Sequence, residues 1–182
     1  DSSEPNWQPM PWTYAPLLLT SQASPITRNV AQVSATMASA IDLVGGEDGL
    51  RKEVLLATST ASKLTATPAR VDLNWGVDNE TSFQYAFIPV AVCIEGSFPS
   101  LYAYQLPPEE ITTQNPLLKQ SKVTKQIVVA AGSAIRNEWQ KDTPLPLGYD
   151  RYTQRQFGNR DFMVNAVLYL TDDQGWMQLR QK

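Results

Sequence analysis

Three polar clusters carry side chains suited to ligand binding, and each directly follows an apolar run that predicts a β-strand. They are residues 58–63, 95–97 and 132–137. In open α/β sheets, ligands bind at the carboxyl ends of strands, where amides, hydroxyls and a Lys or Arg hold an anion. The candidate ligand-binding residues are Ser59, Lys63, Ser133, Arg136 and Asn137. The alternative is ordinary turn chemistry, because the clusters match neither a phosphate-binding loop nor a dinucleotide fingerprint.

Three carboxylates, Asp72, Glu95 and Asp161, offer the remaining route to acid–base catalysis. Two of them close together would suit glycoside hydrolysis. The chain has no histidine, which removes the commonest general base and the usual partner of serine and cysteine nucleophiles. The alternative roles are a solvated strand face, a strand end and a helix cap. We therefore expect no catalytic residue and keep a carboxylate-dependent glycan hydrolase only as an unfavoured alternative.

Cys93 is the single cysteine, and it lies in an apolar run typical of a buried strand. It can form no internal disulfide, and one thiol without histidine does not provide the usual zinc ligands. We expect Cys93 to act as a small buried apolar side chain, with no metal and no cofactor in the protein.

Two groups of aromatic residues suggest contact surfaces. The first lies in the proline-rich segment 1–24 and the second in the loop 140–157. Such side chains either anchor an irregular segment to the core or meet a partner. The candidate partner-binding residues are Trp7, Trp12, Tyr14, Tyr149 and Tyr152.

Short apolar runs predict the elements that must position these residues. The proline-rich segment 1–24 is expected to be an extended arm that ends in a strand at 17–19, and 105–125 is expected to be a loop. Strands are expected at 33–41, where a helix stays possible, and at 54–57, 69–74, 88–94 and 126–131. A helix is expected from Asn159, capped by Asn159 or Asp161. Its buried stripe would comprise Phe162, Asn165, Ala166, Tyr169 and Leu170, widened by Val164, Val167 and Leu168, and a short helix would follow at 176–180.

These elements predict a single α/β domain over residues 1–182, with a mixed, mostly buried central sheet flanked by a few helices. The helices are too few for a full doubly wound sheet, so either chain outside this segment completes the sheet or the sheet is small. A net charge of −3 is too weakly acidic to indicate nucleic acid or an anionic membrane as a partner. No apolar stretch approaches the ~20 residues of a membrane-spanning helix.

Seven stretches, in the same order along the chain, resemble the gliding-motility-associated ABC transporter substrate-binding proteins. The last of them is shared more widely with related ABC-transport auxiliary domains. They are WTYAPLL at 12–18, SPITRN at 24–29, LLATS at 55–59, PVAV at 89–92, EGSFPS at 95–100, PLPLGYD at 144–150 and GNRDFMVNA at 158–166.

The resemblance implies a periplasmic domain of a larger protein, anchored in the inner membrane by helices outside residues 1–182. It implies work with an ABC permease and ATPase in gliding motility or its secretion machinery. It also implies a likeness to the class I glutamine amidotransferase-like fold. The chemistry of that enzyme family cannot be carried over, because Cys93 lies mid-strand and no histidine exists.

Two functions of different kinds follow for this domain. The first is a non-enzymatic auxiliary component that acts mainly through protein–protein contacts, with segments 1–20 and 140–157 as contact surfaces. The second is a receptor that holds a small polar or sugar ligand near Ser59, Lys63, Ser133 and Arg136.

Overall fold

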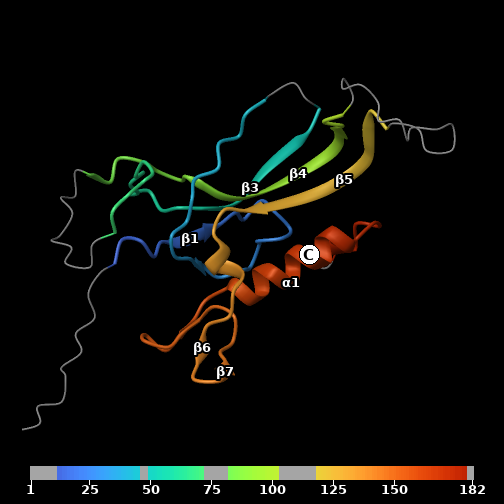
Figure 1. Cartoon of the computed structure of the whole chain (residues 1–182). Helices are drawn as coiled ribbons and strands as arrows, with labels where there is room; N and C mark the ends of the chain where they lie inside the picture. The colour runs from blue at the N-terminus through green and yellow to red at the C-terminus, as the bar shows by residue number, and fades with distance from the viewer. Residues whose placement is uncertain (1–11, 46–48, 72–81, 103–117, 180–182) are drawn as a thin grey trace, which may run out of the picture.

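A curled antiparallel sheet and one long helix form the body of the protein (Figure 1). The computed structural model describes residues 12–45, 49–71, 82–102 and 118–179. In these residues the sheet has five strands in the order β2-β1-β3-β4-β5, and every neighbouring pair is antiparallel. Their bounds are β1 (Leu17–Thr20), β2 (Val33–Ser34), β3 (Arg51–Ala57), β4 (Pro89–Pro99) and β5 (Gln120–Val129).

Apolar runs form the inner strands, as expected from the sequence. β1, β3 and β4 cover the predicted strands at 17–19, 54–57 and 88–94. The first half of β4 is buried at four consecutive residues, 90–93, so both faces of the sheet are covered there. β1 lies between β2 and β3, so the end of the expected arm is an internal strand of the sheet.

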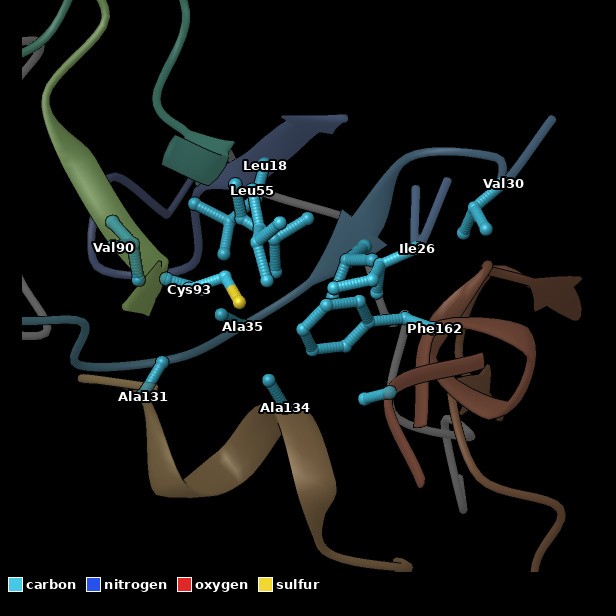
Figure 2. Close-up of a cluster of buried hydrophobic side chains, with 14 of the residues drawn as sticks. Leu18, Ile26, Val30, Ala35, Leu55, Val90, Cys93, Ala131, Ala134 and Phe162 are labelled. Atoms are coloured by element: carbon cyan, nitrogen blue, oxygen red, sulfur yellow. The ribbon is translucent and has the colours of Figure 1, made fainter. Parts of the chain in front are cut away.

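Helix α1 (Asn159–Thr171) packs against one face of the sheet through a short apolar stripe. Phe162 is fully buried among Ile26, Ala134 and other core side chains (Figure 2). Ala166 and Tyr169 continue the stripe at helical spacing, as predicted. Leu170, which was expected in the stripe, is exposed, and so are Val164, Val167 and Leu168, which were expected to widen it.

Gly158, rather than Asn159 or Asp161, is the N-cap of α1. Asn159 is the first helical residue, and its buried side chain bonds to other segments instead of to the helix end. Asp161 stays in the first turn, where a carboxylate interacts favourably with the helix dipole.

Four expectations about strands and loops need correction. The region 33–41 contains only the two-residue strand β2, and residues 69–71 are not strand, while 72–74 lie outside the described residues. The strand expected at 126–131 is β5, which begins at Gln120 and lies at the edge of the described sheet. The loop expected at 105–125 is wrong for residues 120–125, because β5 begins at Gln120. Residues 105–117 of that loop lie outside the described residues. Apolar content identified this strand but not its place in the sheet.

The remaining elements are short. They are the 3₁₀ helix η2 (Gly132–Ile135), the hairpins β6 (Trp139–Gln140) with β7 (Thr143–Pro144) and β8 (Tyr149–Asp150) with β9 (Arg155–Gln156), and the helix α2 (Trp176–Leu179). α2 confirms the short last helix that the sequence predicts. The protein is thus a mixed α/β structure, and its likeness to glutamine amidotransferase-like domains stays a prediction.

Candidate functional site

An open hollow of about 770 Å³ lies beside β1 and the segment that follows β3. We call it the aromatic cavity. It contains two of the predicted ligand-binding residues, Ser59 and Lys63, and two of the predicted partner-binding residues, Trp12 and Tyr14. Its other lining residues are mostly small, hydroxyl-bearing or apolar. The apolar ones include Leu17, Met37, Ala38, Leu64, Val71, Phe83, Ile88 and Val90.

The two aromatic rings at the cavity meet edge to face. The ring centroids of Trp12 and Tyr14 are 5.8 Å apart with an angle of 62° between the planes, which is a favourable aromatic geometry. The carbonyl of Tyr14 accepts a 2.8 Å hydrogen bond from the backbone amide of Met37, which joins this segment to the loop after β2. Trp12 remains 40% exposed, so its ring is open to a ligand.

A tight turn after β3 uses the hydroxyls that the sequence suggested as ligand groups. Ser59 Oγ donates to the carbonyl of Ala61 at 3.0 Å and accepts from the Ala61 amide at 3.3 Å. Thr58 Oγ1 accepts a 3.0 Å hydrogen bond from the amide of Ile88. An isolated β-bridge between Ser62 and Tyr85 continues this pairing. The turn therefore has the local bonding expected of turn residues, and it places Lys63 at the cavity.

Ser133, Arg136 and Asn137 are not among the residues that line the aromatic cavity. Ser133 Oγ donates to the carbonyl of Thr36 at 2.8 Å and accepts from its amide at 2.7 Å, which joins η2 to the loop after β2. Asn137 Nδ2 donates to the carbonyl of Leu145 at 2.8 Å. The structure thus divides the predicted ligand-binding set, and a ligand at these three residues stays a prediction.

Antiparallel pairing explains why the three polar clusters do not meet. Ala57 at the end of β3 pairs with Pro89, and Val129 at the end of β5 pairs with Ala91, so two of the clusters follow strands that end on the same side. Glu95 instead pairs with Arg51, the first residue of β3, and with Lys125 in the middle of β5. The carboxyl ends of antiparallel neighbours point in opposite directions, unlike those of a parallel sheet.

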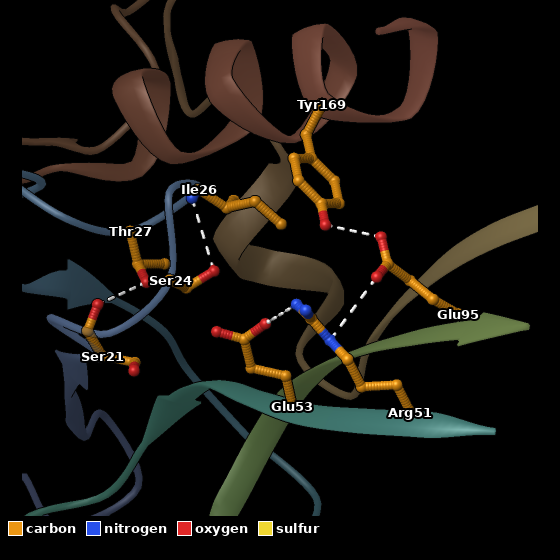
Figure 3. Close-up of polar contacts among 8 residues, drawn as sticks. All are labelled: Ser21, Ser24, Ile26, Thr27, Arg51, Glu53, Glu95 and Tyr169. Atoms are coloured by element: carbon orange, nitrogen blue, oxygen red, sulfur yellow. Dashed lines mark hydrogen bonds and ion pairs between the residues drawn. The ribbon is translucent and has the colours of Figure 1, made fainter. Parts of the chain in front are cut away.

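Glu95 belongs to a second polar group, which joins β3, β4 and α1 (Figure 3). Tyr169 Oη donates to Glu95 Oε1 at 2.5 Å, and Arg51 Nε lies 3.5 Å from Glu95 Oε2. Arg51 Nη2 also forms a 2.7 Å ion pair with Glu53. Burial and the hydrogen bond to Glu95 raise the pKa of Tyr169 well above its usual range. We call these four residues the charged cluster.

Lys125 links the charged cluster to the end of α1. Its Nζ lies 4.4 Å from the centroid of the Tyr169 ring and donates to the carbonyls of Tyr169 at 3.2 Å and Asp172 at 2.9 Å. A cation there satisfies the last carbonyls of the helix and interacts favourably with its dipole. No sequence pattern indicates this cluster, apart from Arg51 and Glu53 at alternate positions of one strand.

A hollow of about 480 Å³ adjoins the charged cluster, and three cations line it. Each of the three is already bonded to the protein. Arg28 Nε donates to the carbonyl of Gln22, Lys52 Nζ to those of Val44 and Gly45, and Arg51 pairs with carboxylates. These contacts indicate that Arg28, Lys52 and Arg51 have structural roles and connect neighbouring segments of the protein.

The carboxylates proposed for hydrolysis do not form a pair in the described residues. Glu95 contacts Tyr169 near the end of α1, whereas Asp161 is exposed in the first turn. Asp161 and Tyr169 are eight positions apart, which corresponds to about 12 Å along a helix axis. Asp72 lies outside the described residues.

Cys93 is buried in β4, as the sequence predicts. Burial raises the pKa of its thiol to about 11, and the carboxylates of Glu95 and Glu53 add to the rise. The thiol is therefore protonated at neutral pH and a poor nucleophile. In the described residues, no group of three His, Cys, Asp or Glu side chains is placed to hold a metal ion.

Comparison with known proteins assigns the chain to a family. Residues 1–166 match the family model described as an ABC-type uncharacterized transport system. The chain belongs to this family. No curated protein and no solved structure matches this ABC transport auxiliary domain. Among its described helices, none combines the length and the apolar character that crossing a bilayer requires.

In this auxiliary domain, the two stretches at 144–150 and 158–166 meet at Asn159. The Asn159 carboxamide accepts from the Ser34 amide at 3.0 Å and from Ser34 Oγ at 3.2 Å, and it donates to the carbonyls of Ser34 at 2.8 Å and Ala134 at 2.9 Å. A Cβ on Gly148 would lie 2.7 Å from Asn159 Oδ1, and one on Gly158 would lie 2.4 Å from the carbonyl of Ala31. The motif residues therefore anchor the start of α1.

The outer face of α1, defined here as Val164, Val167 and Leu168, has no contact that buries it in the described structure. These side chains are 48%, 53% and 38% exposed, and Leu170 beside them is 40% exposed. Their spacing places them opposite the buried stripe. The periodicity of the sequence detected an apolar helix but could not tell which of its faces meets the core.

The two tyrosines of the loop 140–157 differ in exposure. Tyr149 is half-buried in β8, and its amide bonds to the carbonyl of Pro146 at 2.9 Å. Tyr152 is 78% exposed, with the Arg151 guanidinium 4.6 Å from its ring centroid. Trp7 lies outside the described residues. Binding of a partner at any of the five aromatic residues stays a prediction.

Proposed function

We propose that this auxiliary domain is a non-enzymatic contact module of its ABC transport system, and that it docks on the permease subunit through the outer face of α1. The observation that carries the proposal is the row of exposed apolar side chains Val164, Val167 and Leu168 on a helix whose other face is fully packed. Solvent-exposed apolar side chains at helical spacing are typical of a helix that binds another protein.

The permease is the expected partner because the family is defined by association with ABC-type transport. In our proposal the domain lies on the periplasmic side of the inner membrane, anchored by helices outside residues 1–182. The permease and its ATPase then serve gliding motility or the associated secretion. The ordered stretches that resemble the gliding-motility proteins support this more specific assignment.

Three features of the domain favour a non-enzymatic role. The chain has no histidine. Glu95 is bonded to Tyr169 and Arg51, and the Cys93 thiol is buried and protonated at neutral pH. Glu95 and Cys93 therefore have structural roles, Glu95 in linking β3, β4 and α1 and Cys93 in the buried core.

The test is co-purification of the full-length protein with its permease from native membranes. Val167→Glu places a charge in the proposed contact, and glutamate has a good helix propensity. Val123→Glu is the matched control, because Val123 is 81% exposed on β5 and is not part of the outer face of α1. We expect Val167→Glu to lower the recovered permease about tenfold and Val123→Glu to leave it unchanged. Equal recovery with both variants would contradict the proposal.

A second candidate function, the binding of a small solute, is favoured by the aromatic cavity. Its volume of about 770 Å³ is within the usual range of ligand sites, and it joins two aromatic rings with Lys63. Native mass spectrometry of the domain isolated from its own envelope tests this function. A stoichiometric small molecule that Lys63→Gln removes would support it, and an empty domain would count against it.

A further inference from the structure

We propose that the outer edge of β5 binds an extended acidic segment of a second partner protein, which adds a strand to the sheet. The outer edge is defined here as the backbone of residues 123–129 on the side away from β4, together with the side chains of Lys119 and Lys122. The proposal is independent of the docking of α1 on the permease.

The edge is open to a further strand. β5 is the last strand of the described sheet, and in that part of the chain no strand pairs with it on the side away from β4 (Figure 1). It is ten residues long and contains neither proline nor glycine. Its pairing with β4 runs without a register shift from residue 123 to residue 129. Short length, proline and bulges are the features that protect an edge from pairing, and this stretch of β5 has none of them.

The hydrogen-bond pattern shows which backbone groups face outward. The Ala130 amide, just past β5, donates to the Val90 carbonyl at 2.8 Å, so these opposed residues form a hydrogen-bonded pair. Such pairs alternate along an antiparallel ladder with pairs that exchange no bond. The even-numbered residues 124–128 therefore bond to β4, and the odd-numbered residues 123–129 direct their N–H and C=O groups to the outer edge. No backbone hydrogen bond from another described segment reaches these odd-numbered residues.

The charge of the edge favours an acidic partner. Residues 118–137 contain four Lys or Arg side chains and no Asp or Glu, in a protein whose net charge is −3. Lys125 is bonded to the end of α1, whereas Lys119 and Lys122 are exposed and form no ion pair with a described residue. Carboxylates on an added strand would lie beside these ammonium groups, because side chains of neighbouring strands contact one another. The outer face of α1 is apolar instead, so the two surfaces suit different partners.

The same lysines disfavour a second copy of the chain at this edge. Pairing of two β5 strands would bring the lysines of both copies together, and like charges on neighbouring strands are destabilising. Lysine on an edge strand opposes self-association in this way. It selects at the same time for a partner strand of opposite charge.

The test is titration of the protein with a short peptide of alternating glutamate and threonine, followed by amide hydrogen exchange in NMR spectra. We expect the amides of Val123, Lys125 and Ile127 to exchange about tenfold or more slowly when the peptide is bound. The amides of Thr124 and Gln126 are the internal control, because they are already bonded to β4 and should change less.

Two control peptides separate charge from backbone pairing. The same peptide with lysine in place of glutamate reverses the charge and keeps the backbone donors. The acidic peptide N-methylated at every residue keeps the charge and loses the donors. We expect neither control to slow the exchange of the outward-facing amides.

Variants locate the site. Lys122→Glu should weaken binding of the acidic peptide about three- to tenfold, the range expected when one exposed ion pair is lost. Lys141→Glu is the matched control, because it makes the same change of charge at an exposed residue between β6 and β7, which form a different sheet. We expect Lys141→Glu to bind the peptide like wild type.

Several results would overturn the proposal. Equal binding of the acidic and lysine peptides, or no binding of the acidic one, would refute the acidic class of partner. Binding that leaves the outward-facing amides unchanged, or that survives complete N-methylation, would refute strand addition. Slower exchange of these amides at rising protein concentration without peptide would assign the edge to a second copy of the chain.

Discussion

Replacing Asn159 with alanine removes a buried carboxamide that joins three segments of the protein. Its four hydrogen bonds reach the Ser34 amide, hydroxyl and carbonyl on β2 and the Ala134 carbonyl in η2. Each hydrogen bond contributes roughly 0.5–1.5 kcal/mol, and a buried group left without a partner costs more. Because Ser34 is only partly buried and can reach water, we expect a total loss of about 3–5 kcal/mol of unfolding free energy.

Urea unfolding followed by circular dichroism measures this loss as a lower midpoint at unchanged slope. Asn137→Ala is the matched control, because its carboxamide is exposed and donates one hydrogen bond, to Leu145. We expect the control to cost at most about 1 kcal/mol. A loss for Asn159→Ala no larger than that of Asn137→Ala would refute the role assigned to Asn159.

Asn159→Asp sharpens the test, because it keeps the shape but replaces the donor with an acceptor. A carboxylate there would face the carbonyls of Ser34 and Ala134, which are both acceptors. We therefore expect Asn159→Asp to be less stable than Asn159→Ala at pH 7 and to recover part of the difference near pH 4, where the acid is protonated. Identical stability of Asn159→Asp at the two pH values, relative to wild type, would contradict this reasoning.

Three further predictions concern the charged cluster, the buried thiol and the turn beside Asn159. Tyr169→Phe should lower the unfolding free energy by about 1–2 kcal/mol. A double-mutant cycle with Glu95→Ala, which removes the acceptor, should show coupling of similar size, and additivity would contradict the hydrogen bond. Burial raises the pKa of the Cys93 thiol from 9.0 to about 11. The folded state therefore binds the proton more tightly than the unfolded state, and stability should fall as the pH rises from 9 to 11. The fall should approach about 1.4 kcal/mol per pH unit at most, and urea midpoints of Cys93→Ala should decline less steeply over that window, whereas equal declines would contradict the assignment. Gly148→Ala should destabilise the protein by on the order of several kcal/mol, because Gly148 has a φ of +80° and the new Cβ would collide with Asn159. An unchanged melting temperature would refute this.

Local sequence pattern was sufficient for the inner strands and for α1. The run around Val92 is apolar and β-branched, which indicates a buried strand regardless of its partners. β5 has a similar apolar run, yet Val128 on it is 44% exposed because the strand lies at the edge of the described sheet. Position in a sheet depends on pairing between distant segments, which the local pattern does not contain.

The candidate sites illustrate the same limit. Trp12 and Lys63 were each identified by residue type, but only the pairing of β1 with β3 brings their segments to one cavity. Tyr169 was predicted to be a buried helix residue, and its bond to Glu95 could not be predicted because 74 residues separate the two. Val167 was placed on the buried stripe because helical periodicity identifies an apolar face without identifying what covers it.

The most direct measurement of the central claim is site-specific photo-crosslinking in native membranes. A photoreactive amino acid at position 167 of the full-length protein replaces Val167 on the outer face of α1, and the same amino acid replaces Val123 on β5 in a parallel sample. We predict a covalent adduct with the ABC permease from position 167 and none from position 123. Absence of a permease adduct at 167, or equal adducts from both positions, would contradict docking through α1.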